Sequence, residues 1–178
     1  MKAVFVDIDT QLDFLFPAGA LYTPGIESIC GNLAKLTAHA VRVGIPIIST
    51  MDAHIEDDAE FKQGWPHHCV KGTLGQRKLS TTIAARGQQI VEKQTFDCFS
   101  NPRMAELLFE MQPDRVYVYG VVTDVCVMHA VDGLLARNYQ VSIVSDAIYA
   151  YDAGKAETCL GQWRMSHVKF PTTASLRG

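Results

Sequence analysis

Residues 115–137 read RVYVYGVVTDVCVMHAVDGLLAR and place a strand pattern directly before a helix pattern. The apolar run at 115–120 predicts a buried β-strand. Between Cys126 and Arg137 the apolar residues recur in an i, i+3, i+4, i+7 pattern, which predicts an α-helix with one apolar side. These residues are Val127, Ala130, Val131, Leu134 and Leu135. The stretch therefore predicts a strand–turn–helix unit, which is the building block of parallel α/β sheets.

The same alternation continues in both directions along the chain. Short apolar runs predict further strands, and amphipathic patterns predict further helices. The strands are expected at 3–8, 45–50, 90–91, 141–145 and 168–170, and the helices at 29–43, from Asn101-Pro102 onward, and at 153–166. Because no repeat or linker divides the chain, we expect one α/β domain over residues 1–178. Its sheet is expected to be parallel and Rossmann-like, with helices on both faces.

The composition is typical of a globular protein. The chain has 178 residues, is 48% hydrophobic and 20% charged, and has a formal net charge of −3 at pH 7. A nucleic-acid partner normally requires a basic patch, and the sequence has no Lys/Arg-rich run. It also lacks an apolar stretch long enough to span a bilayer and the pattern of a secretory signal. We therefore expect a cytoplasmic protein without nucleic-acid or membrane partners.

Several reactive side chains follow the predicted strands. Asp9 follows the first strand, Asp52 and His54 follow the second, Lys93 the third and Cys126 the fourth. Ligands of parallel α/β sheets bind beyond the carboxyl ends of the strands. Because these ends meet at one edge of the sheet, the sequence predicts an active site there.

Cys126 is the candidate nucleophile of this site. An odd number of cysteines, five in all, does not suit a disulfide framework. At the start of a helix, the dipole favours the thiolate of Cys126 and free N–H groups can hold an oxyanion. Asp9 could accept the thiol proton, and Lys93 could stabilise both anions. The alternatives are a buried structural cysteine, an aspartate that caps a turn and a surface lysine.

The irregular segment from Met51 to Ser80 contains a candidate metal site. Asp52-Ala53-His54 is followed by Glu60 and His68. Two imidazoles and two carboxylates suit one divalent ion such as Zn²⁺, Fe²⁺ or Mn²⁺. The alternative is a polar surface loop with scattered histidines. The intervening acidic residues are expected to be solvated loop charges; they are Glu56, Asp57 and Asp58.

Two aromatic residues accompany these candidates. Phe14 lies five residues after Asp9, and Trp65 lies three residues before His68. Together they could sandwich a flat apolar ring while the metal holds a polar atom on its edge. Both could equally be core residues.

With these motifs in order, the chain resembles the isochorismatase-like cysteine hydrolases, and among them the nicotinamidases. The matching stretches are VDIDTQLDF at 6–14, FPAGALYTPG at 16–25, DAH at 52–54, WPHHCVKGTLG at 65–75, VEKQTFDCF at 91–99 and GVVTDVCV at 120–127. The first and last of these are specific for the superfamily. The Asp-x-His pair and WPHHCVKGT select nicotinamidases among its members.

The resemblance implies a role for each matching residue. Asp9, Lys93 and Cys126 match the catalytic triad, and Asp52, His54 and His68 match metal ligands. The backbone N–H groups of Val122 and Cys126 match the oxyanion hole, with a cis bond between Val121 and Val122, while Phe14 and Trp65 match the ring-binding residues. The chain departs from many relatives at Glu60, where they have a third histidine, and at Leu12, where they have Asn. A carboxylate at position 60 favours harder ions such as Mn²⁺ or Fe²⁺.

The implied activity is hydrolysis of nicotinamide to nicotinate and ammonia through a thioester on Cys126. Three alternatives remain open at this point. A related enzyme could act on another amide, a carbamoyl compound or a vinyl ether. A non-catalytic protein could keep the fold, although Asp9, Lys93 and Cys126 are all retained. A redox-active cysteine protein would require a resolving partner for Cys126. Family members often self-associate, so a homo-oligomer is an open expectation.

Overall fold

Five parallel strands form the central sheet of the computed structural model, in the order β3-β2-β1-β4-β5. The model describes residues 1–176, so the last two residues of the expected domain lie outside it. The strands are β1 (Ala3–Ile8), β2 (Ile47–Asp52), β3 (Gln88–Lys93), β4 (Arg115–Val121) and β5 (Val141–Tyr149). The helices are α1 (Leu12–Leu15), α2 (Cys30–Val43), α3 (Pro102–Met111), α4 (Cys126–Ala136) and α5 (Ala153–Met165).

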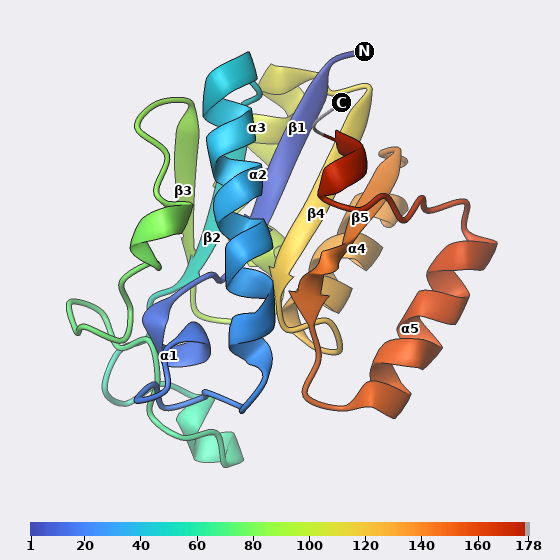
Figure 1. The fold of residues 1–178 in the computed structure, drawn as a ribbon. Coiled ribbons are helices and arrows are strands. Elements are labelled where there is room, and N and C mark those ends of the chain that lie inside the picture. Colours follow the sequence, from blue (N-terminus) through green and yellow to red (C-terminus); the bar gives the residue numbers. More distant parts are fainter. Residues whose placement is uncertain (177–178) are drawn as a thin grey trace.

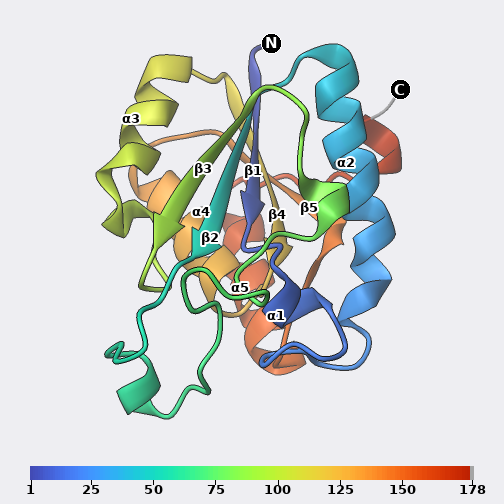
Figure 2. The same ribbon diagram turned by 90° about the vertical axis from the view of Figure 1, so that its left-hand side faces the viewer.

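Helices cover both faces of this sheet (Figures 1 and 2). Alternate residues of β1 face opposite sides, so Val4 and Val6 pack with α3, α4 and α5, whereas Phe5 packs with α2. The three inner strands, β1, β2 and β4, are buried on both faces, as continuous apolar runs require in a parallel sheet, whereas the edge strand β3 is partly exposed. The predicted α/β domain with a parallel sheet is therefore confirmed.

Most expected elements are present with shifted ends. α2 ends at Gly44, whose left-handed φ of 78° and N–H bond to the Ala40 carbonyl match the expected cap. The Asn101 side chain accepts from the Arg103 N–H at the start of α3. The second and third strands were predicted at 45–50 and 90–91 and lie at Ile47–Asp52 and Gln88–Lys93.

The expected strand at 168–170 is wrong. This segment runs along the outer edge of β5 and forms one isolated bridge, between Ser142 and Lys169. Pro171 follows directly and has no N–H with which to extend the ladder. The segment therefore covers the sheet edge without adding a strand.

The topology collects the chemistry-bearing residues at one edge. Asp9 follows β1, His54 follows β2, Lys93 ends β3 and Cys126 begins α4 after β4. The connection between β2 and β3 contains only short 3₁₀ turns, at Phe61–Gln63 and Ser80–Thr82, and much of it lies beyond this edge (Figure 2). Within residues 1–176, none of the helices is both long and apolar enough to cross a membrane.

Gly120 allows β4 to approach β1 closely beside the site. Its φ is 117°, and a Cβ there would lie 2.1 Å from the Ile8 carbonyl oxygen. We expect Gly120→Ala to lower the free energy of unfolding by about 2–4 kcal/mol, measured by urea denaturation. Gly161 in α5 is the matched control, because a Cβ there meets nothing within 4 Å. Gly161→Ala should change stability by less than about 1 kcal/mol, in the stabilising direction; equal effects of both substitutions would contradict this account.

Candidate active site

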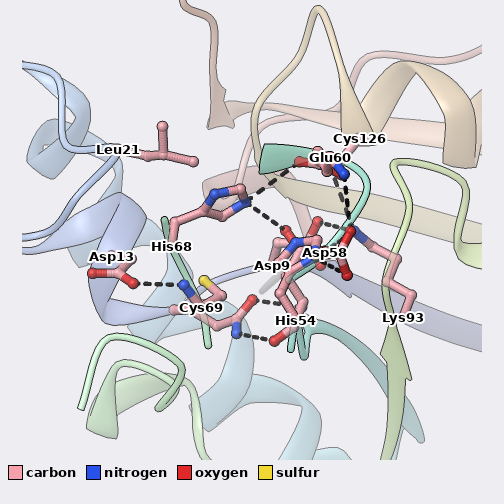
Figure 3. Close-up of polar contacts among 12 residues, drawn as sticks. Asp9, Asp13, Leu21, His54, Asp58, Glu60, His68, Cys69, Lys93 and Cys126 are labelled. Carbon is pink, nitrogen blue, oxygen red and sulfur yellow. Dashed lines mark hydrogen bonds and ion pairs between the residues drawn. The ribbon is translucent and has the colours of Figure 1, made fainter. Parts of the chain in front are cut away.

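Asp9, Lys93 and Cys126 come together at the carboxyl edge of the sheet (Figure 3). The Lys93 ammonium lies 2.9 Å from Asp9 Oδ2 and 3.7 Å from Cys126 Sγ, and it also contacts the Asp52 carboxylate. A carboxylate oxygen of Asp9 lies within 4.8 Å of Cys126 Sγ. All four residues are buried. An acid, a cation and a thiol thus share one site that excludes bulk water.

The turn after β1 sets the direction of the Asp9 side chain. Asp9 has a φ of 48°, a conformation that is uncommon outside glycine. Thr50 on β2 accepts the Asp9 N–H at 3.2 Å, and its hydroxyl donates to Asp9 Oδ1 at 2.6 Å. One carboxylate oxygen is therefore fixed by Thr50, while the other faces Lys93.

Cys126 is the first residue of α4, and no side chain caps this helix. The first N–H groups of a helix have no partner within it, so they are available to an oxyanion. The expected cis bond between Val121 and Val122 is present. The Val122 carbonyl accepts the N–H groups of Val125 and Val127, each at 3.1 Å, which fixes the turn before the helix.

Burial determines the charges of this trio. It raises the pKa of the Cys126 thiol well above the usual value, although Lys93 opposes the shift. Burial also disfavours the charged form of Lys93, but Asp52 and Asp9 outweigh it and raise the pKa of this ammonium. Desolvation of the Cys126 thiolate therefore outweighs the helix dipole, which favours the thiolate. The thiol is protonated at rest, so its use as a nucleophile requires a base. Carboxylate oxygens of both Asp9 and Asp52 lie within 4.8 Å of Sγ, and a hydrogen bond to Asp9 adds to the raised pKa of the thiol.

A second group of side chains could hold a metal ion. One ligand atom from each of Asp52, His54 and His68 lies within 4.8 Å of the others. Glu60 is also buried, with Oε1 3.5 Å from His68 Nε2. His54 Nε2 is buried and has no hydrogen-bond partner among the described residues. An unpartnered imidazole nitrogen beside carboxylates fits a divalent cation.

Burial of the two acids supports the same interpretation. It raises the pKa of Asp52 to about 6, although Lys93 lowers it. It raises the pKa of Glu60 to about 7, although His54 lowers it. Holding both carboxylates ionised therefore costs free energy unless a further cation is bound. The Pro66 carbonyl lies 2.8 Å from His68 Nδ1, which directs His68 Nε2 towards the acids.

Two positioning residues were missed in the sequence. Asp58 was expected to be solvated, but it is 7% exposed and its Oδ2 lies 3.1 Å from His54 Nδ1. Gln11 accepts the Asp52 N–H and donates to the Asp52 carbonyl, each at 2.8 Å. Asp58 lies in a loop without periodicity, so the spacing of residues gave no signal for it. Gln11 lies within the recognised motif at 6–14, but its bonds to Asp52 are visible only in the structure.

A narrow pocket lies between the nucleophile and the candidate metal site. Its cavity volume is about 10 Å³, so its walls lie close together. Phe14 and Trp65 both line it, as the sequence predicted. The remaining apolar lining comes from Leu21, Phe96, Val122, Val125 and Tyr151, and the polar lining from Asp52, Glu60, His68 and Cys126. None of the Lys and Arg residues within 1–176 lines this pocket.

Residues 3–175 match the model of the isochorismatase domain family. The nicotinamidase of Saccharomyces cerevisiae is 23% identical over 82% of this chain and 87% of its own length. The N-carbamoylsarcosine amidase of Thermoplasma acidophilum has a structure 26% identical in sequence, with a TM-score of 0.87 and 100% coverage of both chains. The pyrazinamidase of Pyrococcus horikoshii in complex with zinc is also 26% identical, with a TM-score of 0.87, covering 97% of this chain and 99% of that one.

The contact between Asp58 and His54 predicts an effect on metal affinity. Carboxylates that orient a ligating imidazole usually contribute about 10- to 100-fold to metal binding. We expect Asp58→Ala to weaken Zn²⁺ binding by that factor, measured by competition with a chromogenic chelator. Asp57→Ala is the matched control because the Asp57 side chain is 85% exposed. Equal Zn²⁺ affinity in the two variants would show that Asp58 does not orient a metal ligand.

Proposed function

The chain belongs to the isochorismatase family, and from this premise we propose that it is a metal-assisted cysteine amidohydrolase that converts nicotinamide to nicotinate and ammonia. One observation carries the proposal. A pocket with apolar and aromatic walls has the Cys126 thiol at one side and the Asp52–His54–His68 group at the other. This arrangement suits a flat heteroaromatic ring that carries a carboxamide.

The charge of the pocket supports a neutral substrate. Among residues 1–176, its ionisable lining consists of the acids Asp52 and Glu60 with His68, Cys126 and Tyr151, and the nearby Lys93 ammonium is buried between carboxylates. N-carbamoylsarcosine carries a carboxylate, and among residues 1–176 no Lys or Arg side chain lines these walls to pair with it. Nicotinamide is neutral and planar, so it can pack between Phe14 and Trp65 without an unpaired charge.

The first half of the reaction uses the trio around Lys93. Asp9 accepts the proton of Cys126 Sγ, and the thiolate attacks the carboxamide carbon to form a C–S bond. The N–H groups of Val122 and Cys126 hold the oxyanion. The C–N bond then breaks, and Asp9 returns the proton to the departing ammonia. Lys93, whose ammonium lies 3.7 Å from Sγ and 2.9 Å from Asp9 Oδ2, stabilises the thiolate.

The second half releases the acid. A water molecule occupies the position left by ammonia, and Asp9 accepts one of its protons as it attacks the thioester carbon. The C–S bond breaks and the proton returns to Sγ, which leaves the free acid; the acid loses its remaining proton to solvent and forms the carboxylate. The nicotinate anion then faces the carboxylates of Asp52 and Glu60. The walls that admit neutral nicotinamide therefore favour release of the acid product.

Asp52, His54, Glu60 and His68 are the residues that would hold the metal. When bound, a divalent ion supplies a Lewis acid that can take the pyridine nitrogen and orient the ring. Zn²⁺ suits the histidines, while Glu60 shifts the preference towards Mn²⁺ or Fe²⁺.

The second candidate function is hydrolysis of another small amide or carbamoyl compound. The similarity to the N-carbamoylsarcosine amidase of Thermoplasma acidophilum favours it, because that match is as extensive as the match to the pyrazinamidase. The reacting trio would serve either substrate. The two functions therefore differ in the pocket walls and in the use of the metal.

Ammonia release from nicotinamide tests the proposal. We expect activity that is lost on chelation and regained with Zn²⁺, Mn²⁺ or Fe²⁺, because the metal orients the ring. We also expect kcat/KM for N-carbamoylsarcosine to be at least about 100-fold lower, because no Lys or Arg of residues 1–176 lines the pocket to pair with its carboxylate. Faster hydrolysis of N-carbamoylsarcosine would select the second function. No ammonia release with any of the three metals, from folded protein with a free Cys126 thiol, would exclude nicotinamide.

Replacing the nucleophile should separate chemistry from binding. We expect Cys126→Ala to lower turnover by at least about 10³-fold, because no other group can form the thioester. Nicotinamide binding, measured by calorimetry, should persist because the aromatic walls and the metal site remain. Cys159→Ala is the control, since Cys159 is also buried but lies on α5. Turnover in Cys126→Ala comparable to that of the control would contradict the assignment.

A further inference from the structure

A second buried ion pair lies behind the active-site turn and has no part in the mechanism described above. Lys78 Nζ lies 2.7 Å from Asp7 Oδ2, and both residues are buried. Asp7 also accepts from the Ser49 hydroxyl at 2.9 Å. A charged residue inside the apolar run AVFVDI interrupts an otherwise hydrophobic strand, and burying it costs free energy that the pairing must offset. We propose that Lys78 is a positioning residue for the base Asp9, an inference that rests on the proposed role of Asp9.

Thr10 connects the ion pair to Asp9. The Lys78 ammonium donates to Thr10 Oγ1 at 2.7 Å, and the Leu79 N–H donates to the Thr10 carbonyl at 2.8 Å. Residues 78 and 79 therefore hold both the side chain and the backbone of Thr10. Thr10 is the central residue of a tight turn in which the Gln11 N–H bonds the Asp9 carbonyl at 2.7 Å.

This turn needs external support. Asp9 has a left-handed backbone, which costs free energy for a non-glycine residue and persists when its surroundings fix it. Thr50 holds Asp9 from the β2 side, and Lys78 holds the next residue from the opposite loop. Without the Lys78 contact, the turn can relax and move the carboxylate away from Cys126 Sγ. Displacement of a reacting group by about 1 Å can lower the rate by about 100-fold.

The pair could instead serve stability alone, and a double replacement separates the two roles. Lys78→Met leaves the Asp7 charge buried without its cation, so it should lower Tm. Adding Asp7→Asn removes that charge and should restore most of the lost Tm. If Lys78 positions Asp9, kcat of the double variant stays about 10- to 100-fold low, with KM within about twofold of the original.

Thr10→Val provides an independent route to the same result. It removes the hydroxyl that receives the Lys78 ammonium, and we expect the same loss of kcat as in the double variant. Combining Thr10→Val with the double variant should cause no additional loss, because each already removes the contact between Lys78 and Thr10. Thr82→Val is the matched control. Thr82 is equally buried and receives the Thr10 hydroxyl at 2.9 Å, but it does not hydrogen-bond to Lys78. Its kcat should remain near the original.

A readout without nicotinamide keeps this test separate from the proposed function. The alkylation rate of Cys126 by iodoacetamide, followed by peptide mass spectrometry, should fall in the Lys78 and Thr10 variants together with kcat. If the original protein releases no ammonia from nicotinamide, the proposed function fails while these rates still decide the inference. Recovery of kcat or of the alkylation rate together with Tm in the double variant would overturn it, as would additive losses on combination with Thr10→Val.

Discussion

The buried ammonium of Lys93 is the interaction on which the active-site edge depends. It contacts carboxylates that follow two different strands, Asp9 after β1 and Asp52 at the end of β2, and it lies beside the Cys126 thiol. Two buried carboxylates this close would repel each other and favour protonation without a cation between them. Because Asp52 also belongs to the candidate metal group, the same ammonium joins the nucleophile site to the metal site.

Lys93 does not balance all the acidic groups around it. Asp9, Asp52, Asp58 and Glu60 are all buried at this edge, and the histidines beside them need not be charged. A divalent ion at the second group would offset much of this excess. The remaining negative potential disfavours anionic substrates and promotes release of an anionic product. Metal use and substrate charge are therefore consequences of one electrostatic arrangement.

The sequence predicted the fold and the trio because both depend on strands. Apolar runs marked the strands, and the rule that parallel strands end at one edge brought Asp9, Lys93 and Cys126 together. The positioning residues were harder to predict. Asp58 lies in an aperiodic loop, where sequence spacing does not show which acid turns inward. Asp7 carried a signal that was missed, a charge in an apolar strand, but its partner Lys78 is 71 residues away and only the folded chain pairs them.

Membership of the family sets the chemistry of the site more firmly than its substrate. The candidate reacting groups Asp9, Lys93 and Cys126 lie at strand ends and on the first turn of α4, so the sheet fixes their positions independently of the loops. The pocket walls come mostly from connections: Leu21 before α2, Trp65 between β2 and β3, Phe96 between β3 and α3, and Tyr151 between β5 and α5. Loops tolerate substitution better than sheets, so relatives can keep one nucleophile while they accept different amides. In this chain the four loop side chains are apolar or aromatic, and the proposal of a neutral aromatic amide as substrate rests on them rather than on the trio.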